Sequence, residues 1–374
     1  MRLLYVVSED WYFLSHRLPM ARAARAAGFD VHVATRVSGG APAIAAEGFT
    51  VHDIPFARGT LSPLHSLRTI AAIRRVYRSV APAIVHHVAL QSAVLGSLAA
   101  LGHPAVAVNA LTGFGYTFTS GSMKARLLRG AIERLLRLLL NRRNAVALVQ
   151  NPDDREMLRS IGVADGRIVL IPGSGVDIGS LKPMPEPDGP VTIAFVGRLL
   201  DDKGIRTLIE AHRLLRQGGS NVELLIAGTP DPANPASVTE QEASGWNSEA
   251  GVTWLGQVSD IAGLWARAHI AVLPSHREGL PKSLLEAAAC GRPMIATDVP
   301  GCREVVIADR TGLLVPVGDA RALAKAIARL AETPALRARY GTAARELAVS
   351  TFSDTAIGRQ IIELYRRACG AATA

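Results

Sequence analysis

The sequence predicts an α/β protein with two Rossmann-like, doubly wound parallel-sheet domains that face each other across a cleft. Its 374 residues exceed the size at which one hydrophobic core keeps growing, so two domains are expected. Apolar runs of strand length alternate with helix-like stretches, which is the order of a parallel α/β sheet. Four prolines fall within residues 182–190, and the same alternation restarts after them.

The apolar pattern predicts each element in turn. In the first half, strands are expected at 3–8, 30–35, 50–54, 83–88, 105–110 and 145–150, and helices at 15–27, 64–80, 91–100, 122–142 and 153–161. In the second half, strands are expected at 191–196, 222–227, 252–255 and 270–274, and helices at 205–217 and 261–267. The predicted domains are therefore residues 1–182 and 191–353, joined by a linker at 183–190.

Composition narrows the class of protein. Hydrophobic residues make up 49% of the chain and charged residues 20%, which is typical of a globular protein. Three cysteines without metal-like spacing argue against a disulfide framework and favour a reducing cytoplasm. The short apolar run at the N-terminus is followed by acids, so it reads as a strand rather than a signal peptide. Gly102-His103-Pro104 divides the uncharged stretch 88–108 into a helix and a strand, which argues against a membrane span.

The positive charge lies in the first half of the chain. The net charge is +9; residues 1–180 carry 20 Lys and Arg against 11 Asp and Glu, and residues 181–374 carry 21 of each. Such asymmetry predicts an anionic partner, either nucleic acid or an acidic membrane surface. The stretch 122–143 reads as a basic amphipathic helix that could dock on anionic lipid, or as a core helix with a solvated basic back. No recognised nucleic-acid module is present, so a peripheral membrane role is preferred.

Two acids, Glu278 and Glu286, flank a turn that opens a short helix. The turn is Gly279-Leu280-Pro281, and Lys282 and Ser283 begin the helix. A helix start presents unpaired N–H groups and a partial positive charge, so it can hold a diphosphate, while acids on either side accept hydrogen bonds from hydroxyls. Two glutamates eight residues apart, as Glu278 and Glu286 are, would also arise by chance. The flanking apolar runs 270–274 and 294–297 support a functional role, because they place the loop at the end of a strand.

Other polar residues are expected at the same kind of position. Ser8-Glu9-Asp10, His86-His87, Gly197-Arg198 and residues 275–279 each follow an apolar strand. In doubly wound sheets ligands bind outside the carboxyl ends of the strands, so the cleft is the predicted site.

Taken together, these residues resemble the retaining glycosyltransferases of family 4, which have the GT-B architecture. The matching features are residues 195–199, Lys203-Gly204, the block with Glu278 and Glu286, and residues 312–316. Residues 109–113, 150–154, 172–177 and 297–304 resemble the branch that builds bacterial surface polysaccharides and polyprenyl-diphosphate-linked glycans. The resemblance also implies that a last helix, 354–369, packs back on the first domain.

The resemblance implies roles for the donor-binding residues. Arg198 and Lys203 would neutralise the donor diphosphate, whose charge grows in the transition state. Glu278 would hold the hydroxyls of the transferred sugar, and Glu286 those of the ribose. The remaining donor-side residues are Gly197, which allows close approach of the phosphates, the loop Gly279, Leu280 and Pro281, and the helix start Lys282 and Ser283.

On the acceptor side, the family often places a histidine near the reacting sugar. A strand turns only one of His86 and His87 toward the cleft, and His87 is the preferred catalytic residue, with His86, Thr112 and Gly113 on the acceptor side. The family's Gly-Gly turn is replaced by residues 8–13, whose aromatics Trp11, Tyr12 and Phe13 could meet lipid, stack on a sugar or be partly buried. No Asp-x-Asp motif is present, so neither a metal nor another cofactor is expected.

The hypothesis is a transferase that moves a hexose or N-acetylhexosamine from a nucleotide-sugar, with UDP as the expected nucleotide. The acceptor would be a glycan or a polyprenyl-diphosphate-linked glycan. The protein would be cytoplasmic, and its N-terminal domain would contact the anionic inner face of the cytoplasmic membrane. Two alternatives are open: a nucleotide-sugar epimerase of similar fold and a non-enzymatic anion-binding protein, such as one that binds nucleic acid.

Overall fold

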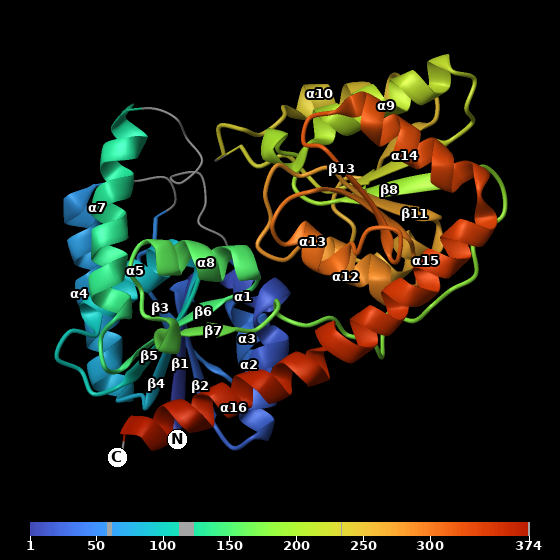
Figure 1. The fold of residues 1–374 in the computed structure, drawn as a ribbon. Helices are drawn as coiled ribbons and strands as arrows, with labels where there is room; N and C mark the ends of the chain where they lie inside the picture. Colours follow the sequence, from blue (N-terminus) through green and yellow to red (C-terminus); the bar gives the residue numbers. More distant parts are fainter. Residues whose placement is uncertain (58–61, 112–122, 233, 373–374) are drawn as a thin grey trace. The chain divides into compact units, whose positions relative to one another are not determined.

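The computed structural model describes residues 1–57, 62–111, 123–232 and 234–372 (Figure 1). The chain forms two compact units, Met1–Gly175 with Asp354–Ala374, and Val176–Ser353. The proline-rich segment 183–190 belongs to the second unit, where Arg292 Nη2 donates to the carbonyl of Pro185 at 2.8 Å. Arg337 also forms a 2.8 Å ion pair with Glu186. These contacts fasten the segment to its own unit.

The first unit contains a seven-stranded parallel sheet. Its order is β3-β2-β1-β4-β5-β6-β7. The strands are β1 (Arg2–Glu9), β2 (Asp30–Arg36), β3 (Thr50–Asp53), β4 (Ile84–Val88), β5 (Val106–Ala110), β6 (Ala145–Val149) and β7 (Ile168–Leu170). The chain builds outward from β1 in one direction and from β4 in the other, so the switch point of this sheet lies between these two strands.

Helices cover both faces of this sheet (Figure 1). They are α1 (Asp10–His16), α2 (Leu18–Ala26), α3 (Ala41–Ala46), α4 (Pro63–Val80), α5 (Ala89–Ala99), α7 (Met123–Leu140), α8 (Pro152–Ser160) and α16 (Asp354–Ala372), with a short 3₁₀ turn at Asp165–Arg167. The expected helix 15–27 is two helices, because Pro19 lacks an N–H and fits only the first turn of α2. In α8, Asn151 caps the helix by accepting from the N–H of Asp154 at 2.8 Å.

The last helix, α16, packs on the first unit. Ile357, Ile361 and Tyr365 share a buried cluster with Tyr5 and Phe13. Tyr5 and Tyr365 are joined through their hydroxyls at 2.9 Å. Burial of such large side chains stabilises the return of the chain by several kcal/mol, at roughly 25 cal/mol per Å² of apolar surface.

The second unit contains a six-stranded parallel sheet in the order β10-β9-β8-β11-β12-β13. The strands are β8 (Thr192–Val196), β9 (Glu223–Ala227), β10 (Val252–Trp254), β11 (Ile270–Leu273), β12 (Met294–Thr297) and β13 (Gly312–Val315). The helices are α9 (Ile205–Gln217), α10 (Glu240–Gly245), α11 (Ile261–Ala266), α12 (Lys282–Ala289), α13 (Cys302–Val305), α14 (Ala320–Glu332) and α15 (Pro334–Leu347), with 3₁₀ turns at Asp201–Lys203 (η2) and Trp246–Ser248 and a π-helical turn at Ala348–Phe352.

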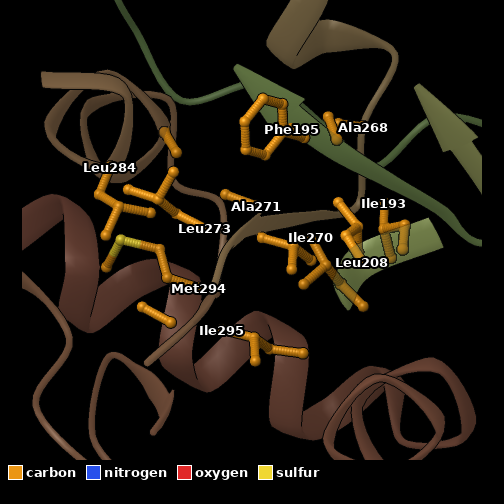
Figure 2. Packing of buried hydrophobic residues seen from close by; sticks show 14 of the residues in the cluster. Ile193, Phe195, Leu208, Ala268, Ile270, Ala271, Leu273, Leu284, Met294 and Ile295 are labelled. Atoms are coloured by element: carbon orange, nitrogen blue, oxygen red, sulfur yellow. The ribbon is translucent and has the colours of Figure 1, made fainter. Parts of the chain in front are cut away.

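The core of the second unit surrounds its central strands (Figure 2). Ile193 and Phe195 of β8 pack with Ile270 of β11 and Leu284 of α12, and all four are buried. Both faces of these strands are covered, as near-continuous apolar runs predict. The two parallel sheets confirm the predicted α/β class. In this sheet the switch point lies between β8 and β11.

The uncharged stretch 88–108 has the length of a membrane span. Within the described ranges, no helix combines the length and the apolar character that a membrane crossing needs. Residues 88–108 instead form α5 and the start of β5, each part of the first unit.

Candidate active site at the switch point of the second unit

Two loops meet where β8 and β11 end. Gly197-Arg198 follows β8, and Pro274-Ser275 follows β11. Gly204 has a φ of +71°, and a Cβ placed on it would lie 2.0 Å from the carbonyl oxygen of Pro274. The N–H of His276 also donates to the carbonyl of Asp202 at 2.8 Å. Only glycine permits this close approach, so Gly204 fixes the two loops against each other.

The structure brings Lys203 and Glu278 together. Lys203 Nζ lies 2.5 Å from Glu278 Oε1, and Ser275 Oγ donates to the same oxygen at 2.7 Å. The two side chains are 23% and 9% exposed, so the pair is largely screened from solvent. A charge-assisted hydrogen bond in such surroundings orients both groups strongly. The sequence places Ser275 at the end of an apolar strand, in the predicted cleft, but assigns it no role; the hydrogen bond to Glu278 supplies one.

The helix that follows, α12, begins as predicted. Pro281 precedes Lys282 with extended backbone, and no side chain caps the helix. The first-turn N–H groups therefore remain suited to an anion. Gly301, at a φ of +78°, packs under the turn, because a Cβ there would lie 2.5 Å from the carbonyl oxygen of Gly279. Leu280 is half-buried against the core, and Ser283 occupies the first turn.

Glu286 lies one turn into this helix and is buried. Burial raises the pKa of its carboxyl above the ordinary value, and Lys282, 3.4 Å away, opposes the shift. A buried acid with one partly exposed lysine is suited to accept hydrogen bonds from ligand hydroxyls.

Arg198, the second predicted phosphate-binding cation, pairs with a different acid. Its Nη1 lies 2.8 Å from Asp231 Oδ2, and the two side chains are 45% and 12% exposed. Asp231 follows β9 in a Thr-Pro-Asp-Pro segment, and sequence reasoning missed it because nothing local marks it as the partner of Arg198. Arg198 thus pairs with Asp231, whereas Lys203 pairs with Glu278.

Both predicted histidines are fully buried in the first unit. His87 Nδ1 donates to Asn109 Oδ1 at 2.7 Å, and its Nε2 accepts from the Tyr77 hydroxyl at 2.7 Å. Burial lowers the pKa of His87 to about 4. His86 lies on the opposite face of the sheet, where its Nδ1 is 2.6 Å from the Tyr365 hydroxyl and burial holds its pKa well below the ordinary value.

This burial argues against the expected direct contact between His87 and an acceptor. The side chains of β4 alternate, so the rings of His86 and His87 point to opposite faces of the sheet, as predicted. Both faces are covered, and neither ring is exposed at the carboxyl ends of the strands. Thr112 and Gly113, the other expected acceptor-side residues, lie outside the described residues.

The neutral state of His87 predicts acid-sensitivity of the first unit. Its pKa is about 4 in the folded protein against 6.5 when unfolded, so its contribution is complete above pH 6.5 and is lost as the pH falls toward about 4. The expected loss is about 3 kcal/mol. Hydrogen exchange of the β4 and β5 amides, measured between these pH values, should show a shallower loss of protection in His87→Asn than in wild type. His276→Asn, at an exposed position of the second unit, should keep the wild-type slope.

A parallel sheet with a lysine, a buried acid and an uncapped helix start at its switch point is suited to bind an anionic ligand. The family model described as glycosyl transferases group 1 matches residues 190–333, and the one described as glycosyl transferase 4-like matches residues 2–151. The chain belongs to this family of glycosyltransferases, and its two-sheet architecture is GT-B.

Individual proteins agree with this assignment. Alpha-maltose-1-phosphate synthase of Mycolicibacterium smegmatis is 30% identical over 85% of this chain and 87% of its own length. N,N'-diacetylbacillosaminyl-diphospho-undecaprenol alpha-1,3-N-acetylgalactosaminyltransferase of Campylobacter jejuni is 26% identical over 86% of each chain. The capsular polysaccharide biosynthesis glycosyltransferase CapM of Staphylococcus aureus is 32% identical, but the match spans 46% of this chain and 45% of that protein.

A solved structure supports the fold over nearly the whole chain. HepE of Anabaena, in complex with UDP and glucose, superposes with a TM-score of 0.80 at 19% identity and covers 97% of this chain and 99% of its own. At this identity the likeness concerns the fold.

Proposed function

We propose that this glycosyltransferase transfers a hexose or N-acetylhexosamine from a UDP-sugar to a glycan or polyprenyl-diphosphate-linked acceptor, in the synthesis of bacterial surface polysaccharide. The observation that carries the proposal is the pair of Lys203 and Glu278 at the switch point between β8 and β11. The named roles of CapM and the Campylobacter transferase favour the pathway and the acceptor class. The UDP and glucose in HepE favour the nucleotide.

The site suits a donor with an anionic centre and hydroxyls at both ends. In the proposed complex, Lys203 and Arg198 turn toward the diphosphate, and the start of α12 adds backbone N–H groups. Glu278, released from Lys203, accepts hydrogen bonds from the sugar, and Glu286 accepts them from the ribose.

The proposed reaction retains the anomeric configuration and needs no metal. The bond from the anomeric carbon to the diphosphate oxygen breaks, and the acceptor oxygen bonds to the same carbon on the same face. The acceptor proton passes to the departing phosphate oxygen. Lys203 and Arg198 stabilise the negative charge that grows on the diphosphate, which is the part a divalent cation plays elsewhere.

A product assay tests this proposal. The protein is incubated with UDP-glucose, UDP-galactose and their N-acetylated counterparts, with and without undecaprenyl-diphosphate-linked sugar, in EDTA. One donor should give a product with the same anomeric coupling constant as the donor. An epimerase would instead convert a donor alone into a new nucleotide-sugar, and an inverted product or full dependence on added metal would contradict the proposed mechanism.

The basic first unit suggests the membrane location. In the described part of α7, Arg134 and Arg137 are exposed, and Leu138 is 71% exposed beside them. Exposed arginines with an apolar side chain favour anionic lipid surfaces. The proposal therefore places the protein at the inner face of the cytoplasmic membrane.

Sedimentation with vesicles tests the membrane contact. At low salt, vesicles with a third phosphatidylglycerol should sediment the wild-type protein, and neutral vesicles should not. Replacing Arg134 and Arg137 by Glu should reduce the partition coefficient onto these vesicles at least about thirtyfold, because each basic residue near the surface contributes about 1 kcal/mol. Arg310→Glu with Arg321→Glu makes the same charge change on the second unit and should bind like wild type. Equal loss of binding in both double variants would show that binding depends on the net charge of the protein and not on α7.

A further inference from the structure

The switch point of the first sheet carries a second group of polar residues. β1 lies between β2 and β4, and its last residue, Glu9, is followed directly by Asp10 and Trp11 at the start of α1. This is the place where a doubly wound sheet accepts a ligand. The backbone nearby is strained, because Ala89, directly after β4, has a φ of +68° without being glycine. Strain of this kind concentrates at ligand sites.

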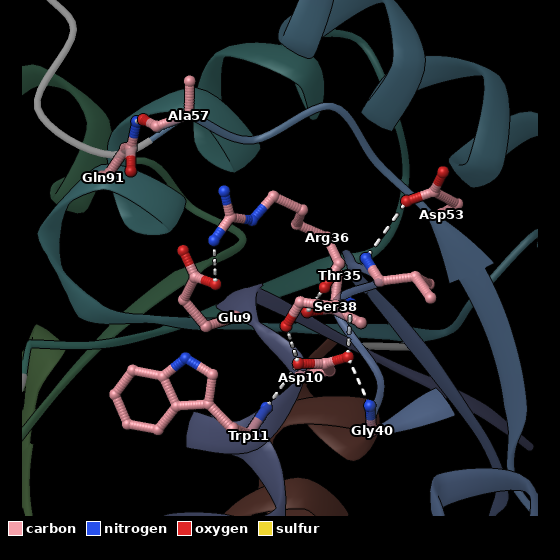
Figure 3. Close-up of polar contacts among 11 residues, drawn as sticks. Glu9, Asp10, Trp11, Thr35, Arg36, Ser38, Gly40, Asp53, Ala57 and Gln91 are labelled. Carbon is pink, nitrogen blue, oxygen red and sulfur yellow. Dashed lines mark hydrogen bonds and ion pairs between the residues drawn. The ribbon is translucent and has the colours of Figure 1, made fainter. Parts of the chain in front are cut away.

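Asp10 supports the neighbouring loop (Figure 3). Its carboxylate accepts from the N–H groups of Ser38 at 2.6 Å, Gly40 at 2.8 Å and Trp11 at 2.7 Å, and from the Ser38 hydroxyl at 2.6 Å. Burial alone would raise the pKa of Asp10, but these hydrogen bonds lower it below the ordinary value. Asp10 is therefore committed to the loop that follows β2 and gives the site a rigid base.

Glu9 and Arg36 form an ion pair beside this base. Glu9 Oε2 lies 2.7 Å from Arg36 Nη2, and the two side chains are 4% and 41% exposed. Arg36 Nε is buried and has no hydrogen-bond partner among the described residues. This half-buried ion pair joins the ends of β1 and β2, next to the switch point, where its two charged groups can meet a ligand.

Trp11 completes the group. Of the three consecutive aromatics, Trp11 is the exposed one, with a relative exposure of 42%. Phe13 is buried, and the ring of Tyr12 stacks on that of His16 with their centroids 4.2 Å apart. Figure 3 shows the Asp10 carboxylate turned toward Ser38 and Gly40, while the indole ring of Trp11 extends away from these two residues. An exposed indole suits the apolar face of a pyranose ring.

We propose that Glu9, Trp11 and Arg36 bind a sugar ring of the acceptor and select its hydroxyl pattern. The indole covers one face of the ring. The carboxylate accepts hydrogen bonds from hydroxyls on the ring edge, and the guanidinium donates to hydroxyl oxygens. This inference rests on the proposed function and names the residues by which the first unit recognises its acceptor.

Tryptophan fluorescence of the full-length protein tests the site. Trp11 is the one tryptophan in residues 1–175; the other three are Trp246, Trp254 and Trp265. Methyl glycosides of glucose, galactose, N-acetylglucosamine and N-acetylgalactosamine serve as probes. At least one should give a saturable change with a midpoint on the order of millimolar. Trp11→Phe should abolish that change, and Trp254→Phe, at a half-buried position of the second unit, should keep it.

The ion pair is tested by Glu9→Gln and Arg36→Lys. Glu9→Gln should raise the midpoint at least about tenfold, because it weakens hydrogen bonds made to a charged group, and Arg36→Lys should raise it less. Thermal stabilisation by UDP should be unchanged in every variant, which shows that the second unit is intact. A glycoside response that is absent in wild type, or unaffected in Glu9→Gln, would overturn the inference while UDP stabilisation persists. Loss of UDP stabilisation in wild type would count against the proposed function instead.

Discussion

Replacing Lys203 by Ala should reduce sugar transfer by roughly 100- to 1,000-fold, because removal of one group that stabilises developing charge has an effect of this size. Glu278→Gln should reduce transfer by a comparable factor, since the amide keeps the shape but loses the charged acceptor. Steady-state rates with saturating donor and acceptor measure both effects.

The matched control is Arg206, which lies on the same loop-helix segment and forms ion pairs with Asp201 and Glu242. Arg206→Ala removes a cation near Lys203 in the sequence without touching Glu278, and we expect transfer within about threefold of wild type, since exposed ion pairs contribute little. If Lys203→Ala and Arg206→Ala show the same turnover, the role assigned to Lys203 is wrong.

Replacing Gly204 by Ala should produce the second large effect, a loss of stability of the second unit. The added Cβ would lie 2.0 Å from the carbonyl of Pro274, in a backbone conformation with a φ of +71°. The conformational cost alone is about 1 to 2 kcal/mol, and the backbone clash adds to it, so about 3 kcal/mol or more is expected. Urea unfolding followed by the tryptophan fluorescence of this unit measures the change.

Gly219 is the matched control, because alanine there has the same backbone strain as at Gly204 but no steric clash. Its φ is +82°, and a Cβ placed on it meets nothing within 4 Å. Gly219→Ala should therefore destabilise by about 1 to 2 kcal/mol only. Equal losses in the two variants would show that the meeting of the two loops at Gly204 contributes nothing.

The apolar pattern predicts the frame of the second-unit site well. The runs that became β8 and β11 are bounded by Gly197 and Ser275, so the loops that carry Lys203 and Glu278 could be placed at strand ends before any contact was known. The start of α12 also follows from local sequence, because Gly279 and Pro281 do not favour a helix that begins earlier in the loop. What could not be predicted is the direct pairing of Lys203 with Glu278, which joins residues 75 positions apart.

The remaining differences arise from contacts between distant residues. Four prolines indicate a break at 182–190, but Arg292 and Arg337 fasten this segment to the second unit from more than 100 positions away. The alternation of side chains along β4 predicts that His86 and His87 point to opposite faces of the sheet. It does not predict that Tyr365 covers His86 on one face and Tyr77 covers His87 on the other. The three-residue edge strand β7 was not predicted although its residues are all apolar, whereas β10, of the same length, was.

Calorimetric titration of UDP into wild type, Lys203→Ala and Glu278→Gln tests the central claim, that Lys203 leaves Glu278 to bind the donor diphosphate. UDP carries the diphosphate without the sugar, so only Lys203→Ala should weaken its binding. Lys203→Ala should weaken binding at least about tenfold, and Glu278→Gln should bind as tightly as wild type or more tightly, because its lysine no longer has to break an ion pair. Unchanged affinity in Lys203→Ala, or equal weakening in both variants, would contradict this account of the site.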